Sequence, residues 1–353
     1  MSADIIRADA LALPLADASV DLIVTSPPYF GLRSYQDGGE HYAGQIGDEA
    51  TPREFVDALI AATAEMVRVL KPSGSIWINL GDSYYSGKGA PGRTTVDTKS
   101  EARTARRLGG NPLDGPSFGI QRKSLVGLPW RYALRCIDDL GLILRAEVVW
   151  SKPNGLPESV TDRVRRSHET WFHFTKEPRY FAAVDEIREP HTATTAGRST
   201  VGWKPGPSGN REVGRGAWDG ATVRDFATNP LGKLPGSVWE IPTQPLKVPA
   251  ELGIDHFAAF PMEWPRRIVR GWSPQGGTVL DPFSGTGTTA LVAHALGRHG
   301  IGVDLSADYC RLARWRTSDP GQLAAAMGVE KPPVEGCGTD DLLSLLIPPA
   351  GAR

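Results

Sequence analysis

Cysteine is scarce in this chain of 353 residues, which has only Cys136, Cys310 and Cys337. Their scattered positions give neither a disulfide framework nor a metal-ligand spacing, so we expect no metal site and a reducing cytoplasm as the simplest compartment. No apolar run approaches the length of a transmembrane helix, and the first residues lack a signal-peptide pattern. The formal net charge of −1 excludes a histone-like polycation but not a groove with local basic charge.

A Walker-type Gly-Lys-Ser/Thr is also missing, so we expect no triphosphate site. What the chain does have is a strand–turn–helix pattern over residues 277–296, with Gly285 and Gly287 in the turn. Glycines there permit a positive φ and the close approach of a ligand to the backbone. The next strand, residues 299–304, ends in Asp304, and a carboxylate at that place suits the two hydroxyls of a ribose. This pattern predicts a nucleotide-binding crevice.

The residues before the turn restrict the ligand further. Asp281 would repel a pyrophosphate and attract a cation or an ammonium group, and Ala290 stands where a dinucleotide fingerprint has its third glycine. S-adenosylmethionine has an ammonium, a sulfonium and a ribose, so it fits better than NAD. A nicotinamide dehydrogenase would also need a hydride-acceptor site, and the sequence shows no pattern for one.

The second motif is Ser26-Pro27-Pro28-Tyr29, which follows an apolar stretch at residues 20–25. The two prolines fix two φ angles and remove two N–H donors, so the carbonyls around them are left to accept bonds from a ligand. Tyr29 is placed to stack on a flat ring. A strand that ends in Pro-Pro is often no more than a strand end, because proline cannot continue the ladder. With the nucleotide motif, however, the pattern favours a cradle for an exocyclic amino group on a planar base.

With both motifs in this order, the chain resembles the amino-methylating DNA methyltransferases of the N4-cytosine/N6-adenine group. The catalytic motif comes first and the cofactor turn last, which is similar to the β-class, a circular permutation of the common fold. The resemblance covers residues 1–84, 125–190 and 237–317. It implies an α/β, Rossmann-like fold with a mostly parallel sheet, helices on both faces and an antiparallel edge hairpin. It also implies S-adenosylmethionine as cofactor and double-stranded DNA as partner.

The resemblance assigns roles to particular residues. Ser26, Pro27, Pro28 and Tyr29 would form the catalytic site, with Phe30 either a second wall or part of the core. The cofactor-binding residues would be Asp9, Phe260, Pro261, Asp281, Phe283, Ser284, Gly285, Gly287, Thr288 and Asp304. We expect structural roles for His256 and for the pair His168-Glu169, and core packing for the tryptophans at 77, 150, 239 and 272. In the family Ser-Pro-Pro-Tyr goes mainly with cytosine N4, so we predict transfer to N4 of a flipped-out cytosine.

Apolar periodicity predicts an alternation of strands and helices. We expect strands at 3–13, 20–25, 76–80, 142–150, 168–175 and 180–184. Thr51-Pro52-Arg53-Glu54 opens a helix with a capping box, and a further helix is expected at 129–140. We divide the chain into a catalytic half at 1–189, a target-recognition region at 190–250, a cofactor half at 251–317 and a tail at 318–353.

Two long Gly-rich stretches, 83–124 and 190–236, interrupt the alternation with basic residues, which in the second are interleaved with tryptophans. They are either solvated insertions or DNA contacts, since loops this long are usually functional or disordered. We prefer DNA contacts, because basic residues with interspersed aromatics favour phosphate contact and base stacking, and because the catalytic motifs are those of a DNA methyltransferase. The predicted DNA-binding residues are Arg103, Arg106, Arg107, Arg122, Lys123, Arg211 and Arg215.

Three other functions stay open on the sequence alone: N6-adenine methylation by the same machinery, methylation of a protein glutamine, and an inactive DNA-binding relic. A glutamine methyltransferase would usually have Asn before the prolines and the unpermuted motif order. A relic would be expected to have lost Ser26, Asp281 or Gly285, and all three are present. The sequence does not say whether a cognate restriction endonuclease acts beside the enzyme.

Overall fold

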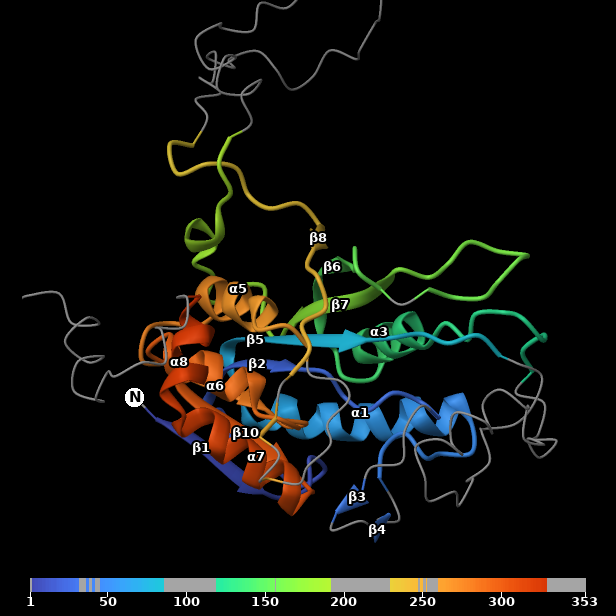
Figure 1. Ribbon diagram of the computed structural model, residues 1–353, viewed down its shortest axis with the longest axis horizontal. Coiled ribbons are helices and arrows are strands. Elements are labelled where there is room, and N and C mark those ends of the chain that lie inside the picture. The colour runs from blue at the N-terminus through green and yellow to red at the C-terminus, as the bar shows by residue number, and fades with distance from the viewer. Residues whose placement is uncertain are drawn as a thin grey trace, which may run out of the picture.

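The computed structural model describes residues 2–31, 36–37, 40–41, 45–85, 119–155, 157–191, 229–246, 248–249, 252 and 260–328 (Figure 1). Its elements in chain order are β1 (Ala3–Arg7), β2 (Val20–Thr25), β3 (Gln36–Asp37), β4 (Glu40–His41), α1 (Pro52–Val69), β5 (Leu70–Leu80), α3 (Leu128–Asp138), β6 (Ile143–Ser151), β7 (His168–Thr175), the 3-10 turn η1 (Val184–Ile187), β8 (Val238–Glu240), α5 (Glu263–Trp272), β9 (Thr278–Asp281), α6 (Thr288–Ala295), β10 (His299–Asp304), α7 (Ala307–Ser318) and α8 (Pro320–Met327).

The main sheet has eight strands in the order β1-β10-β9-β2-β5-β7-β6-β8. Strand β7 is antiparallel to both of its neighbours, and every other pair in the sheet is parallel. The α/β class, the mostly parallel sheet and the antiparallel β6–β7 hairpin predicted from the sequence are therefore confirmed. The short β8, parallel to β6, forms the edge beyond that hairpin.

Helices cover both faces of the sheet, as the alternation of elements requires (Figure 1). Helices α1 and α3 pack on one face over a core that includes Phe55, Ile78 and Phe172. On the other face α5 and α6 pack over a second core, which contains Trp264 and Ala293 together with the tryptophans at 77, 150, 171, 239 and 272. The four tryptophans predicted to be core residues are at most 8% exposed, so that prediction is confirmed.

Helix α1 begins as its sequence predicts. The Thr51 side chain accepts a hydrogen bond from the Glu54 backbone, and the Glu54 carboxylate accepts one from the Thr51 backbone. This capping box satisfies two backbone donors that a helix start leaves without partners.

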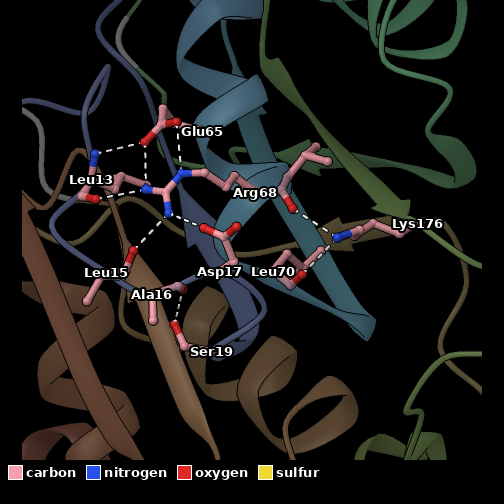
Figure 2. A network of polar contacts seen from close by, with 10 residues as sticks. Leu13, Leu15, Ala16, Asp17, Ser19, Glu65, Arg68, Leu70 and Lys176 are labelled. Atoms are coloured by element: carbon pink, nitrogen blue, oxygen red, sulfur yellow. Dashed lines mark hydrogen bonds and ion pairs between the residues drawn. The ribbon is translucent and has the colours of Figure 1, made fainter.

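Arg68, near the end of α1, ties this helix to the connection between β1 and β2 (Figure 2). Its guanidinium donates to the carbonyls of Leu13 at 2.8 Å and Leu15 at 2.9 Å. It also pairs with Asp17 at 2.6 Å and with Glu65 at 2.8 Å, and its hydrogen bonds lower the pKa of the Glu65 carboxyl. One side chain thus fixes the segment that leads into β2 and from there to the Ser-Pro-Pro-Tyr motif.

Two sequence predictions of strands need correction. The strand expected at 180–184 is wrong: the Phe181 backbone N–H donates to the Ser73 carbonyl in β5, and the Ala183 N–H donates to the Gly271 carbonyl in α5, so the segment bonds to two different elements rather than along one strand. The strand expected at 3–13 ends at Arg7. A turn follows, in which Asp9 accepts bonds from the backbone N–H groups of Leu11 and Ala12. No helix of the described residues is long and apolar enough to cross a membrane.

Candidate active site

The predicted functional residues gather at one edge of the sheet. Parallel strands present their carboxyl ends at the same edge, and ligands bind there in open α/β sheets. Ser26 follows β2, Asp281 ends β9, Asp304 ends β10 and Asp9 follows β1. Since β7 is antiparallel, its first residues lie at this edge too (Figure 1).

Ser26 and Tyr29 converge on one amide. The Ser26 hydroxyl donates to Asn79 Oδ1 at 3.2 Å, and the Tyr29 hydroxyl lies 2.8 Å from the same oxygen. Asn79 is on β5, beside β2, and its Nδ2 donates to the Thr170 carbonyl on β7, which fixes the orientation of the amide. With its hydrogen committed to Asn79, the Ser26 oxygen presents only lone pairs to a ligand.

Tyr29 has a second partner that we had not expected. Its hydroxyl lies 2.8 Å from Glu169 Oε2 on β7, and Lys152, just after β6, forms an ion pair with the other oxygen of Glu169. Both charged side chains are more than four-fifths buried, and the Lys152 ammonium also lies 4.0 Å from the centre of the Trp150 ring. Glu169, for which we predicted a structural role, thus contacts the predicted catalytic motif itself.

The two prolines of the motif and the residues next to it are positioned by burial and packing. Pro27 is buried and Pro28 is half-buried. The Phe30 ring lies 5.5 Å from that of Phe55 in α1, so of its two predicted roles the structure shows core packing. Gly81 gives the Tyr29 ring its place, because a Cβ built on Gly81 would lie 2.6 Å from a carbon of that ring.

The predicted cofactor turn lies between β9 and α6. Gly287 has a φ of +76° at the start of α6, a conformation that side chains disfavour, and a Cβ there would lie 2.7 Å from Ala313 of α7. Gly285 N–H donates to Asp304 at 2.8 Å, and Ser306 N–H donates to its other carboxylate oxygen at 2.9 Å. These two bonds hold the Asp304 carboxylate beside the turn, at the end of β10.

Asp281 has its partners inside the protein. It is 1% exposed; Thr25 donates to one carboxylate oxygen at 2.6 Å and Thr289 to the other at 2.9 Å. The Phe283 backbone N–H donates to it as well, at 3.1 Å. Burial raises the pKa of the Asp281 carboxyl to about 6 in spite of these bonds. The structure therefore shows Asp281 bonded to the β2 and α6 sides of the turn; the predicted contact with an ammonium group stays a prediction.

Three further predicted cofactor residues precede or follow other elements. Asp9 is exposed and follows β1, the strand beside β10. Phe260 makes an edge contact with Trp171 at 5.8 Å, and the Pro261 carbonyl accepts the Trp264 N–H near the start of α5. His256 lies outside the described residues.

Most of the predicted DNA-binding residues also lie outside the described part of the chain: Arg103, Arg106, Arg107, Arg211 and Arg215. Of the remaining two, Arg122 is exposed and Lys123 forms an ion pair with Asp162 in the β6–β7 connection. Among the described residues, no group of three or more His, Cys, Asp or Glu side chains is arranged to hold a metal ion.

The turn has the chemistry that S-adenosylmethionine requires. Ser284 Oγ is buried and has no hydrogen-bond partner within the described residues, and Thr286 and Thr288 add two further buried hydroxyls. A carboxylate at the end of the next strand suits a ribose. An orphaned hydroxyl inside a glycine turn fits a polar ligand that approaches the backbone closely. The fold and the cofactor chemistry together define a methyltransferase dependent on S-adenosylmethionine, with the predicted catalytic motif preceding the predicted cofactor turn.

Comparison with known proteins agrees with this class. Residues 20–314 match the family described as DNA methylase, of the N6/N4 methyltransferase type. The Type II methyltransferase M.XycI of Xanthomonas campestris pv. cyanopsidis is 37% identical over 299 residues, which cover 85% of this chain and 81% of the relative. M.SmaI of Serratia marcescens is 36% identical over 296 residues, which cover 84% of this chain and 83% of the relative. The chain belongs to the N6/N4 DNA methylase family, and S-adenosylmethionine is its cofactor.

Solved structures share the fold. The structure of the PvuII cytosine-N4-specific DNA methyltransferase aligns with a TM-score of 0.58 over 93% of this chain and 92% of its own, at 19% identity. A DNA modification methylase of Thermus thermophilus, solved with S-adenosylmethionine, aligns with a TM-score of 0.50 at 25% identity over 92% of this chain and 94% of its own.

Proposed function

We propose that this DNA methyltransferase transfers the methyl group of S-adenosylmethionine to N4 of a cytosine that is flipped out of double-stranded DNA. The observation that carries the proposal is the hydroxyl of Ser26, whose hydrogen is committed to Asn79. Its oxygen can then only accept, and an exocyclic amino group is a donor. The curated relatives are Type II methyltransferases, which favours a modification enzyme that works beside a restriction endonuclease.

The amino nitrogen of cytosine is a weak nucleophile because its lone pair is delocalised into the ring. Bonds from its two hydrogens to the Ser26 oxygen and the Pro27 carbonyl favour a pyramidal nitrogen, whose lone pair points away from the ring. S-adenosylmethionine supplies an electrophilic methyl on sulfur: the S–C bond breaks, an N–C bond forms, and the nitrogen then loses a proton to solvent. The protein contributes positioning and preorganised acceptors rather than a covalent intermediate.

Tyr29 gives the base a surface on which to stack. Base extrusion costs a few kcal/mol, and stacking on an aromatic ring returns about 1–3 kcal/mol. The ring is held by contacts on its hydroxyl from Asn79 and Glu169 and is packed against Gly81. A ring fixed in this way stabilises the flipped base without first losing its own rotational freedom.

The DNA itself would be held by residues of the two basic stretches, 83–124 and 190–236. Arg122 is exposed in the part of the 83–124 insertion that the structure describes. Arg103, Arg106, Arg107, Arg211 and Arg215 remain predicted phosphate contacts. We also keep residues 190–250 as the predicted recognition region.

The test is methyl transfer from labelled S-adenosylmethionine to unmethylated duplex DNA, with the product nucleosides resolved by mass spectrometry. We expect N4-methylcytosine, and a rate about 10²-fold lower for Ser26→Ala, because one preorganised partner of the amino group is lost. Ser19→Ala is the matched control: the Ser19 hydroxyl bonds to Ala16 in a turn away from the site.

N6-methyladenine as the product would contradict the assignment of cytosine as the target base. It would leave unchanged the proposal that Ser26 and Pro27 bind an exocyclic amino group. Equal rates for Ser26→Ala and wild type would contradict the role of the hydroxyl. Failure of the wild-type enzyme to methylate any DNA would contradict the proposal as a whole.

A further inference from the structure

A buried guanidinium lies directly behind the cofactor turn. Arg316 of α7 is 1% exposed. Its Nη1 donates to the Thr286 carbonyl at 3.0 Å, to the Thr286 hydroxyl at 2.7 Å and to the Thr288 hydroxyl at 2.9 Å. Its Nε is 3.4 Å from the side-chain oxygen of Gln322. The same arginine thus contacts both threonines of the turn.

All of these partners are neutral. Within the described part of the chain no carboxylate pairs with Arg316, and burial alone lowers its pKa to about 10. A buried charge without an opposite charge destabilises a protein unless some other group balances it. The residues around Arg316 leave that balance incomplete, which points to an anion that is not part of the chain.

The hydroxyl groups of the turn have a hydrogen with which to reach such an anion. The hydroxyls of Thr286 and Thr288 both accept from Arg316, so their own hydrogens are directed away from it. The two hydroxyl oxygens lie 3.3 Å apart, and one hydrogen can bridge them. The other is available to a third group.

We propose that Arg316 is the counter-charge for the carboxylate at the methionine end of S-adenosylmethionine, and that it acts through the hydroxyls of Thr286 and Thr288. Asp281 lies at the other end of the same turn and has the opposite charge. The turn is thus built for an α-amino-acid zwitterion, with a buried carboxylate on the side of β9 and a buried guanidinium on the side of α7. Arg316 is a positioning residue, because it reaches the cofactor through the two threonines.

A purely structural role for Arg316 would lead to a different result when the arginine is replaced. If Arg316 only held the turn in shape, its loss would weaken every ligand of the turn alike. If it balances the cofactor's carboxylate, its loss weakens only ligands that have that carboxylate. S-adenosylhomocysteine has the amino-acid group, whereas 5′-methylthioadenosine has the same adenosine and thioether without it.

The experiment is calorimetric titration of both ligands into wild-type protein, Arg316→Lys and Arg316→Met, without DNA. We expect Arg316→Met to lower the affinity for S-adenosylhomocysteine about 10- to 100-fold, the range for loss of a charge-assisted interaction. The affinity for methylthioadenosine should change by less than about twofold, which is a small difference in binding free energy. Arg316→Lys keeps the charge and should be intermediate. The surface control Arg135→Met should change neither affinity.

Equal losses for the two ligands, or no loss for either, would overturn the proposal. Thermal unfolding without ligand shows whether Arg316→Met is folded. If it is not, Thr286→Val keeps the arginine and removes one relaying hydroxyl. We then expect Thr286→Val to lower the affinity for S-adenosylhomocysteine and to leave that for methylthioadenosine unchanged. An equal loss of affinity for both ligands counts against the proposal. Because no DNA is present, the outcome does not depend on which base is methylated.

Discussion

The Tyr29 hydroxyl has one hydrogen and two oxygen neighbours at the same distance, 2.8 Å, on Asn79 and Glu169. These contacts come from two different strands, so together they fix the plane of the ring as well as its distance from Ser26. Lys152 holds the Glu169 carboxylate in place from the opposite side. We infer that Glu169 acts on catalysis through Tyr29.

A double-mutant cycle tests this. Tyr29→Phe and Glu169→Leu should each lower kcat/KM, and because they remove the same contact their effects should couple by about 1–2 kcal/mol. The loss of the Lys152 ion pair is common to both backgrounds, so it cancels in the cycle. Glu158→Leu, which removes a carboxylate paired with Arg163, should be additive with Tyr29→Phe. Additivity of Glu169→Leu within about 0.5 kcal/mol would show that it does not act through the ring.

At this scale the sequence predicts contiguous motifs well and dispersed contacts poorly. Ser26 and Tyr29 are neighbours in one short motif, and the structure brings both to Asn79. Asn79 is on β5, Glu169 is on β7 and Lys152 follows β6, so the chain separates the three residues by up to 90 positions. Only the sheet order β2-β5-β7-β6 brings them together. Arg316 was missed for the same reason, since nothing in its local pattern distinguishes it from the surface arginines of α7.

Among the elements, the end of β5 determines how closely Tyr29 can approach. A Cβ on Gly81 would lie 2.6 Å and 3.1 Å from two carbons of the Tyr29 ring, and the two contacts on the hydroxyl keep the ring from moving freely. We therefore expect Gly81→Ala to lower kcat roughly 10²-fold, the effect of a displacement of about 1 Å at a reacting group. Gly236→Ala is the control, because a Cβ there meets nothing within 4 Å. Steady-state methylation of duplex DNA measures both, and a wild-type kcat for Gly81→Ala would contradict the argument.

The elements also show where periodicity is informative. Helix α1 and the strands with continuous apolar runs form where the sequence predicts them, because each buries a face whose pattern is visible locally. Residues 180–184 have a strand-like composition, but two of their backbone donors bond to Ser73 in β5 and to Gly271 in helix α5, so no single strand pairs with them. The partner of a short segment, rather than its composition, decides whether it is a strand.

In the whole molecule, two distant parts of the chain meet at the centre of the sheet. Thr25 ends β2 in the predicted catalytic half and Asp281 ends β9 in the predicted cofactor half, 256 residues away, and their side chains bond at 2.6 Å. Thr289 of α6 bonds both to Asp281 and to the Val24 carbonyl. The circular permutation predicted from motif order requires such a junction, since the catalytic and cofactor motifs must lie side by side although they lie far apart in the sequence.

The ionisation of Asp281 links this junction to pH. Its pKa is raised to about 6 by burial, above the ordinary value of 3.8, so the folded protein binds its proton more tightly than the unfolded chain does. The stability that Asp281 contributes is therefore full below the unfolded-state pKa and is lost as the pH rises through about 6. The Asp281→Asn variant is the reference, because its amide does not ionise. As the pH falls from 8 to 4, the free energy of unfolding of the wild-type protein without cofactor should rise, relative to that of the variant, by on the order of 2–3 kcal/mol. Urea denaturation of the two proteins across this range measures the difference, with the surface variant Asp57→Asn as control. If the difference between wild type and Asp281→Asn stays constant, or if wild type gains stability as the pH rises, the buried carboxyl does not have the raised pKa that its surroundings impose.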